Sequence, residues 1–107
     1  MTTFNDRERA FEEKYARDEA LQFKVNARRN KLLGLWAAAK LGKSGAEAEA
    51  YAKEVVISDF EAPGHEDVLH KVAKDFKEAG LDISREVICA ESERLLKEAR
   101  HQLMNEG

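Results

Sequence analysis

The sequence predicts an all-α protein: a small four-helix bundle preceded by a mobile, nascent-helical N-terminal arm. Apolar residues recur at positions i, i+3 and i+4 in several segments, which is typical of helices with one buried face. No segment alternates apolar and polar residues as a half-buried strand would. Short connections separate the segments and favour antiparallel neighbours. With 107 residues, the chain is long enough for one modest core and not for a second.

The first 39 residues carry two apolar faces. From Phe4 to Ala39 there is no proline and only one glycine, so no residue forces a helix to stop. At about 100° per residue, the first face carries Phe4, Phe11 and Tyr15. The second face is rotated by roughly a quarter turn and carries Leu21, Val25, Leu32, Trp36 and Ala39. If the second face joins a core, the first points elsewhere and needs another partner.

The first apolar face gives way to the second at Arg17-Asp18-Glu19. This change divides the chain into an N-terminal arm, residues 1–18, and a bundle, residues 19–107. The arm offers only three aromatic side chains for burial, and an isolated helix of this length is marginal in water. We therefore expect the arm to be partly disordered alone and to be ordered by a partner. In the alternative, the aromatic side chains fold back onto the bundle as ordinary core.

Four helices are expected in the bundle, and residues that stop or start helices mark their ends. Glycines and the one proline end the first three helices, at Gly42, Pro63-Gly64 and Gly80. Hydroxyl side chains can cap the second and the last helix, at Ser44 and Ser84. The expected core includes Leu32, Trp36, Val72, Phe76 and, on the last helix, Val87, Ile88, Leu95, Ala99 and Leu103.

Composition excludes several classes of protein. Charged residues make up 36% of the chain, and the net charge of −3 argues against nucleic acid as the main partner. The one cysteine, Cys89, excludes an internal disulfide and favours a reducing compartment. The N-terminus is charged from Asp6 onward, unlike a signal peptide. The longest nearly apolar run, from Leu32 to Ala39, is far too short to span a bilayer. We expect a soluble, cytoplasmic protein without membrane insertion.

Two short motifs imitate functional sites. Gly42-Lys43-Ser44 resembles the end of a phosphate-binding loop, but that loop needs a glycine where Ala37 stands and a strand before it. His65 and His70 imitate a zinc-protease helix, but their i,i+5 spacing places them about 140° apart around the helix. No nucleophile, base and oxyanion site is assembled, so we expect neither catalysis nor a metal.

A basic cluster lies in the first bundle helix. Arg28, Arg29 and Lys31 are close together in sequence and are surrounded by carboxylates. Charge runs on helices usually form a solvated face, which is the simpler interpretation. In the alternative, the three side chains contact a phosphate group or an acidic partner.

Three blocks of sequence indicate a family. FNDRERAF at residues 4–11, ARRNKLLGLWAA at residues 27–38 and AYAKEVV at residues 50–56 closely resemble the zeta subunit of alphaproteobacterial F1Fo-ATP synthase. The resemblance covers nearly the whole chain, and the RRNKLLGLWAA block is its most specific part. It implies a four-helix bundle with an inhibitory N-terminal arm that blocks ATP hydrolysis, and no enzyme activity.

The resemblance also implies a partner and a location. The arm would insert at a catalytic interface of the F1 head and touch the central rotor, which places the protein in the cytoplasm, peripheral to the inner membrane. We expect a monomer when the protein is free. No cofactor is required, although family members are associated with binding ATP or ADP through the bundle.

The arm supplies the expected contact residues. They are Phe4, Arg7, Arg9, Phe11, Lys14, Tyr15 and Arg17. The aromatic side chains would enter the interface, and the arginines would pair with carboxylates around them. Two alternatives remain: a nucleotide-binding sensor whose bundle is the active part, and a generic helical adaptor.

Overall fold

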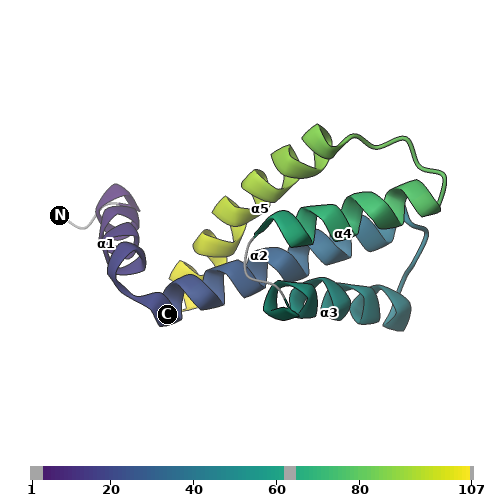
Figure 1. The fold of residues 1–107 in the computed structure, drawn as a ribbon. Coiled ribbons are helices and arrows are strands. Elements are labelled where there is room, and N and C mark those ends of the chain that lie inside the picture. The colour runs from purple at the N-terminus through teal and green to yellow at the C-terminus, as the bar shows by residue number, and fades with distance from the viewer. Residues whose placement is uncertain (1–3, 62–64, 107) are drawn as a thin grey trace.

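The computed structural model describes residues 4–61 and 65–106, and the side chains of residues 8–59 and 66–106. These residues form five α-helices, α1 (Phe4–Arg17), α2 (Glu19–Lys40), α3 (Ala46–Glu61), α4 (His65–Glu78) and α5 (Arg85–Glu106), as Figure 1 shows. The described residues contain no strand, so the prediction of an all-α protein is confirmed. Helices α2 to α5 correspond to the four expected bundle helices. The arm, expected as a nascent helix, forms a fifth.

Helix α2 is the centre of the molecule. It contacts each of the other four helices, most extensively α3 and α5. Helix α4 packs against α2, α3 and α5 and completes the bundle. The molecule is elongated, with principal extents of 52 × 27 × 25 Å, and α1 lies at one end of the long axis (Figure 1).

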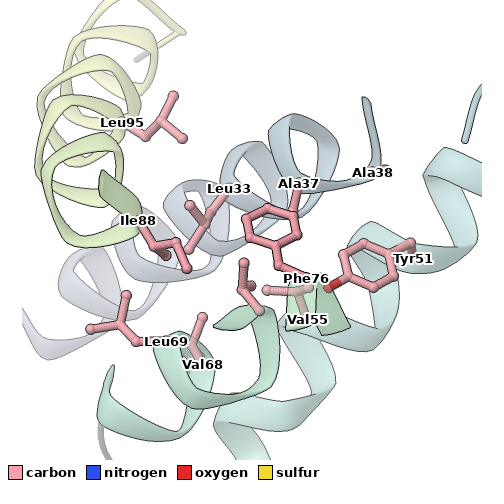
Figure 2. Close-up of a cluster of buried hydrophobic side chains, with 11 residues drawn as sticks. Leu33, Ala37, Ala38, Tyr51, Val55, Val68, Leu69, Phe76, Ile88 and Leu95 are labelled. Carbon is pink, nitrogen blue, oxygen red and sulfur yellow. The ribbon is translucent and has the colours of Figure 1, made fainter. Parts of the chain in front are cut away.

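The core lies where α2, α3, α4 and α5 meet. Figure 2 shows side chains from these four helices converging on one cluster. Phe76 of α4 is fully buried, and the Trp36 ring of α2 meets it edge-on at 5.7 Å between ring centroids. The other buried members are Leu33, Ala37, Ala38, Tyr51, Val55, Val68, Leu69, Val72, Ile88 and Leu95. Of the described side chains of α1, none belongs to this cluster.

The buried side of α2 differs from the predicted face. Val25 is fully buried as expected, but Leu21, Leu32 and Trp36 are only half-buried, and Ala39 is exposed. The structure buries Leu33, Ala37 and Ala38 instead. Because α2 has neighbours on several sides, a single stripe of apolar residues does not define its buried surface.

Two predicted helix ends are confirmed by their hydrogen bonds. Gly42 follows α2 with φ +79°, and the Lys43 N–H donates to the Ala38 carbonyl over 2.9 Å. Gly80 follows α4 with φ +75°, and the Leu81 N–H donates to the Phe76 carbonyl, also over 2.9 Å. Both are glycine-terminated ends in which the left-handed residue returns the next N–H to the last helical turn.

Of the two predicted helix starts, one is confirmed and the other is wrong. Ser84 caps α5, because its Oγ accepts a 3.3 Å hydrogen bond from the Val87 N–H. Ser44 does not cap α3 in this way. Helix α3 begins only at Ala46, and the Glu47 N–H donates to the Ser44 main-chain carbonyl over 3.2 Å. The predicted break at Pro63-Gly64 lies outside the described residues.

Candidate functional site: the N-terminal arm

Asp18 separates the arm helix from the bundle. Its backbone is extended, with φ −109° and ψ 104°, between the last residue of α1 and the first of α2. Its Oδ1 accepts hydrogen bonds from the Ala20 N–H (3.0 Å) and the Leu21 N–H (3.2 Å), so Asp18 is the N-cap of α2. The break falls within the polar run at which the sequence changes phase.

Two contacts tie the end of α1 to the bundle. The Gln22 side chain of α2 donates through Nε2 to the Tyr15 carbonyl over 2.8 Å, and so bonds one of the carbonyls that a helix end leaves without partners. On the other side, the guanidinium carbon of Arg100 in α5 lies 5.4 Å from the centre of the Tyr15 ring, a cation–π distance.

Between α1 and α5 lies an open groove of about 610 Å³. Its α1 side carries two carboxylates, Glu8 and Glu12, whereas its α5 side carries a row of basic side chains. These basic residues are Arg94, Lys97, Arg100 and His101. A second groove on the other side of Phe11 is lined by Leu21, Leu103 and Met104, among others. Phe11 and Met104 line both grooves, so they form the ridge between them.

The structure places the predicted arm residues in two groups. Phe11 and Tyr15 are half-buried toward α5, whereas Arg9, Lys14 and Arg17 are exposed. Lys14 and Arg17 lie together along a shallow groove at the α1–α2 junction. The side chains of Phe4 and Arg7 lie outside the described residues.

The two aromatic residues therefore match neither sequence interpretation fully. Neither Phe11 nor Tyr15 is buried, so they are not ordinary core. They do not point away from the bundle either, because Tyr15 lies near Arg100 of α5 and Phe11 lines a groove shared with α5. The extended backbone of Asp18 separates the helix that carries the first apolar face from the helix that carries the second, and α1 therefore turns toward α5.

The basic cluster of α2 does not form a single solvated face. Arg28 makes two parallel hydrogen bonds to the Glu106 carboxylate, at 2.9 and 3.1 Å, and a third to Gln102 at 2.8 Å. Arg29 is only 8% exposed and donates to Asn30 Oδ1 over 3.2 Å. Lys31 is exposed. Arg28 thus joins the middle of α2 to the end of α5, and only Lys31 keeps the solvated position expected for all three.

Arg29 has an unusual environment for a cation. Burial lowers its pKa, while the nearby Asp59 and Tyr15 oppose that change. These two neighbours come from α3 and α1, so Arg29 lies near the place where the arm meets the bundle. A phosphate or acidic partner would reach Lys31 directly, and the other two side chains only after their present contacts rearranged.

Sequence reasoning missed the α5 half of this site. Arg100 lies near the Tyr15 ring and Met104 lines a groove together with Phe11, yet neither residue was predicted as part of the site. The available signal was the spacing of Arg94, Lys97 and Arg100, three cations at i and i+3 that share one helix face. Nothing local in the sequence pairs that face with α1.

The described residues thus form a helical bundle that carries a separate, charged helix. Among the described residues, no group of three or more His, Cys, Asp or Glu side chains is placed to hold a metal ion. Likewise, no helix in the described ranges is long and apolar enough to cross a membrane.

Comparison with protein families matches residues 1–102 to ATPase inhibitor subunit zeta. The chain belongs to this family, which confirms the resemblance seen in the sequence and gives the protein an inhibitory, regulatory role. A structure solved by solution NMR is 52% identical, with a TM-score of 0.72, and the match covers 81% of this chain and 99% of that one. A search of curated proteins finds no match.

Proposed function

We propose that this protein inhibits ATP hydrolysis by the F1 head of ATP synthase, and that α1 is the part that enters a catalytic interface. The observation that carries the proposal is that the family match includes the arm, while the described side chains of α1 add nothing to the buried core. A helix that adds no described side chain to the core is available for a partner.

The proposed mechanism is steric. Phe11 and Tyr15 anchor α1 in an interface that must open and close during each hydrolytic step. Anchors of this kind typically contribute about 2 kcal/mol or more each to binding. The exposed Arg9 and Arg17 pair with carboxylates around the interface. The bundle stays outside, in the cytoplasm, and acts as a stop, so the protein works as a monomer peripheral to the membrane.

The direct test is ATP hydrolysis by the cognate F1 with increasing amounts of the intact protein. We expect the rate of hydrolysis to fall as the protein is added and to reach a plateau when all F1 heads are occupied. Hydrolysis that stays constant at a large excess of the protein would contradict the proposal.

A second candidate function is nucleotide binding by the bundle. The groove between α1 and α5 carries Lys97, Arg100 and His101, cations that could bind a polyphosphate in competition with the carboxylates of the same groove. Titration of ATP or ADP into the labelled protein, followed through amide chemical shifts, tests this candidate. Saturable shifts along α5 would support it, and unchanged shifts at millimolar nucleotide would exclude it. Arm-dependent inhibition in the absence of any effect of nucleotide would favour the first proposal.

A further inference from the structure

We propose that the C-terminal half of α5 is a resting dock for α1, and that the arm must leave this dock before it can inhibit the ATPase. The inference rests on the proposed function in one respect, namely that α1 is the inhibitory element. The dock itself is a property of the free chain. Figure 1 shows α1 as a separate helix at the end of the molecule where α2 begins and α5 ends.

The dock uses the same side chains that would anchor α1 in the partner. Tyr15 lies under the Arg100 guanidinium at 5.4 Å. Phe11 lies at the ridge it shares with Met104. Both aromatic side chains are half-buried, and neither can fill a pocket in another protein while it remains against α5. Binding to α5 and binding to a partner are therefore mutually exclusive.

Charge favours the closed position. Glu8 and Glu12 on α1 line the same groove as Lys97 and His101 of α5, so opposite charges lie on its two sides, while Arg94 binds Glu91 of its own helix. Opposite charges across a groove also keep α1 in one orientation. The carboxylate on α5 that lines the same groove, Glu98, is flanked by these cations.

The contact is weak enough to open. The groove is open and lies between α1 and α5, so no continuous core joins the two helices. Arg100 Nε is buried and has no hydrogen-bond partner among the described residues, which reduces what the Tyr15 contact contributes. When only a fraction of molecules is open, the apparent affinity for the partner falls by that fraction. The dock thus sets how readily the arm inhibits.

The first test uses amide hydrogen exchange of the full free chain. In Arg100→Gln, exchange of residues 8–17 should accelerate by about 2- to 30-fold, the range expected on losing one cation–π contact. Arg85→Gln makes the same change of charge on the same helix, at the end far from α1, and should leave this exchange unchanged. Equal exchange of α1 in Arg100→Gln and the original chain would overturn the dock.

The second test closes the arm covalently. Glu12→Cys and Lys97→Cys, in a Cys89→Ser background, place one thiol on each side of the groove. A flexible bis-maleimide should join them within one chain, and the joined protein should lose at least 10-fold in inhibition of F1. The same double-cysteine chain without the cross-linker is the matched control, and the loss of inhibition is measured against it.

The outcomes separate the two proposals. If the joined protein still inhibits fully, or if no cross-link forms within the chain, the dock is wrong. If the unmodified protein fails to inhibit F1, the proposed function is wrong, and hydrogen exchange in Arg100→Gln still decides whether α5 holds the arm. Should Arg100→Gln fail to fold, the cross-link alone decides the question.

Discussion

One hydroxyl joins α3 to α4. The Tyr51 hydroxyl donates to Asp75 Oδ2 over 2.7 Å, and the Lys71 ammonium binds the same oxygen at 3.2 Å. Burial, together with the bond to Asp75, raises the pKa of Tyr51 above its ordinary value of 10.0. Because the folded-state pKa is raised, this stabilising contribution is complete below pH 10 and is lost as the pH rises beyond it.

Removing this hydroxyl should weaken the bundle. Tyr51→Phe should lower the free energy of unfolding by about 1–2 kcal/mol, since Asp75 loses one hydrogen bond but keeps Lys71. Urea unfolding at pH 7 measures the change. Tyr15→Phe removes the same group from α1, outside the core, and should change the stability little. Equal stability of Tyr51→Phe and the original chain would mean that water replaces the bond at no cost.

The ion pair between Arg28 and Glu106 should be visible in a titration. The hydrogen bonds from Arg28 lower the pKa of Glu106 below its ordinary value of 4.5. Because the folded-state pKa is depressed, the pair contributes stability above that ordinary value and loses it as the pH falls through the folded-state pKa. Arg28→Gln should raise the Glu106 midpoint in a carboxylate NMR titration, and Lys31→Gln should leave it unchanged. An unchanged midpoint in Arg28→Gln would refute the pair.

At the scale of the helices, Gly34 lets α3 approach α2 closely. A Cβ at this position would lie 2.6 Å from the Ala52 Cα and 3.1 Å from the Ala52 Cβ. The first of these atoms is backbone, so it cannot move aside as a flexible side chain could. The glycine in the middle of α2 is therefore required by the approach of α3 rather than by its own backbone conformation.

Gly34→Ala should consequently destabilise the bundle. In an exposed helix the same change usually stabilises by roughly 0.5–1 kcal/mol. Here we expect a loss of about 1–3 kcal/mol, the usual cost of overpacking. The exposed Ala39→Gly on the same helix should cost only the ordinary helix-propensity difference. Thermal unfolding of both variants decides the matter, and a more stable Gly34→Ala would show that α3 can move away freely.

The apolar pattern predicted the buried side chains of α4 better than those of α2 and α5. The apolar pattern of α4 identified Val72 and Phe76 correctly, since its opposite face is solvent-exposed. In α5 the pattern identified Ile88 but failed for Val87, which is 50% exposed. The dock of α1 on α5 joins residues more than 80 positions apart, so local periodicity carries no information about it.

At the scale of the whole molecule, the buried core and the arm helix lie at separate places along its length. The core fills the region shared by α2 to α5, and α1 lies beyond it at one end (Figure 1). Asp18 belongs to the bundle, because it caps α2. A clean removal of the arm should therefore end at residue 17 and leave Asp18 in place.

The most direct measurement compares the intact chain with residues 18–107 in two assays, ATP hydrolysis by the cognate F1 and thermal unfolding. We predict that removing residues 1–17 abolishes inhibition while the melting temperature falls by only a few degrees, since α1 supplies no core residue. Phe76→Ala is the control that damages the core and leaves the arm unchanged. It should lower the free energy of unfolding by about 3–5 kcal/mol. Full inhibition by residues 18–107 would contradict the account and transfer the inhibitory role to the bundle.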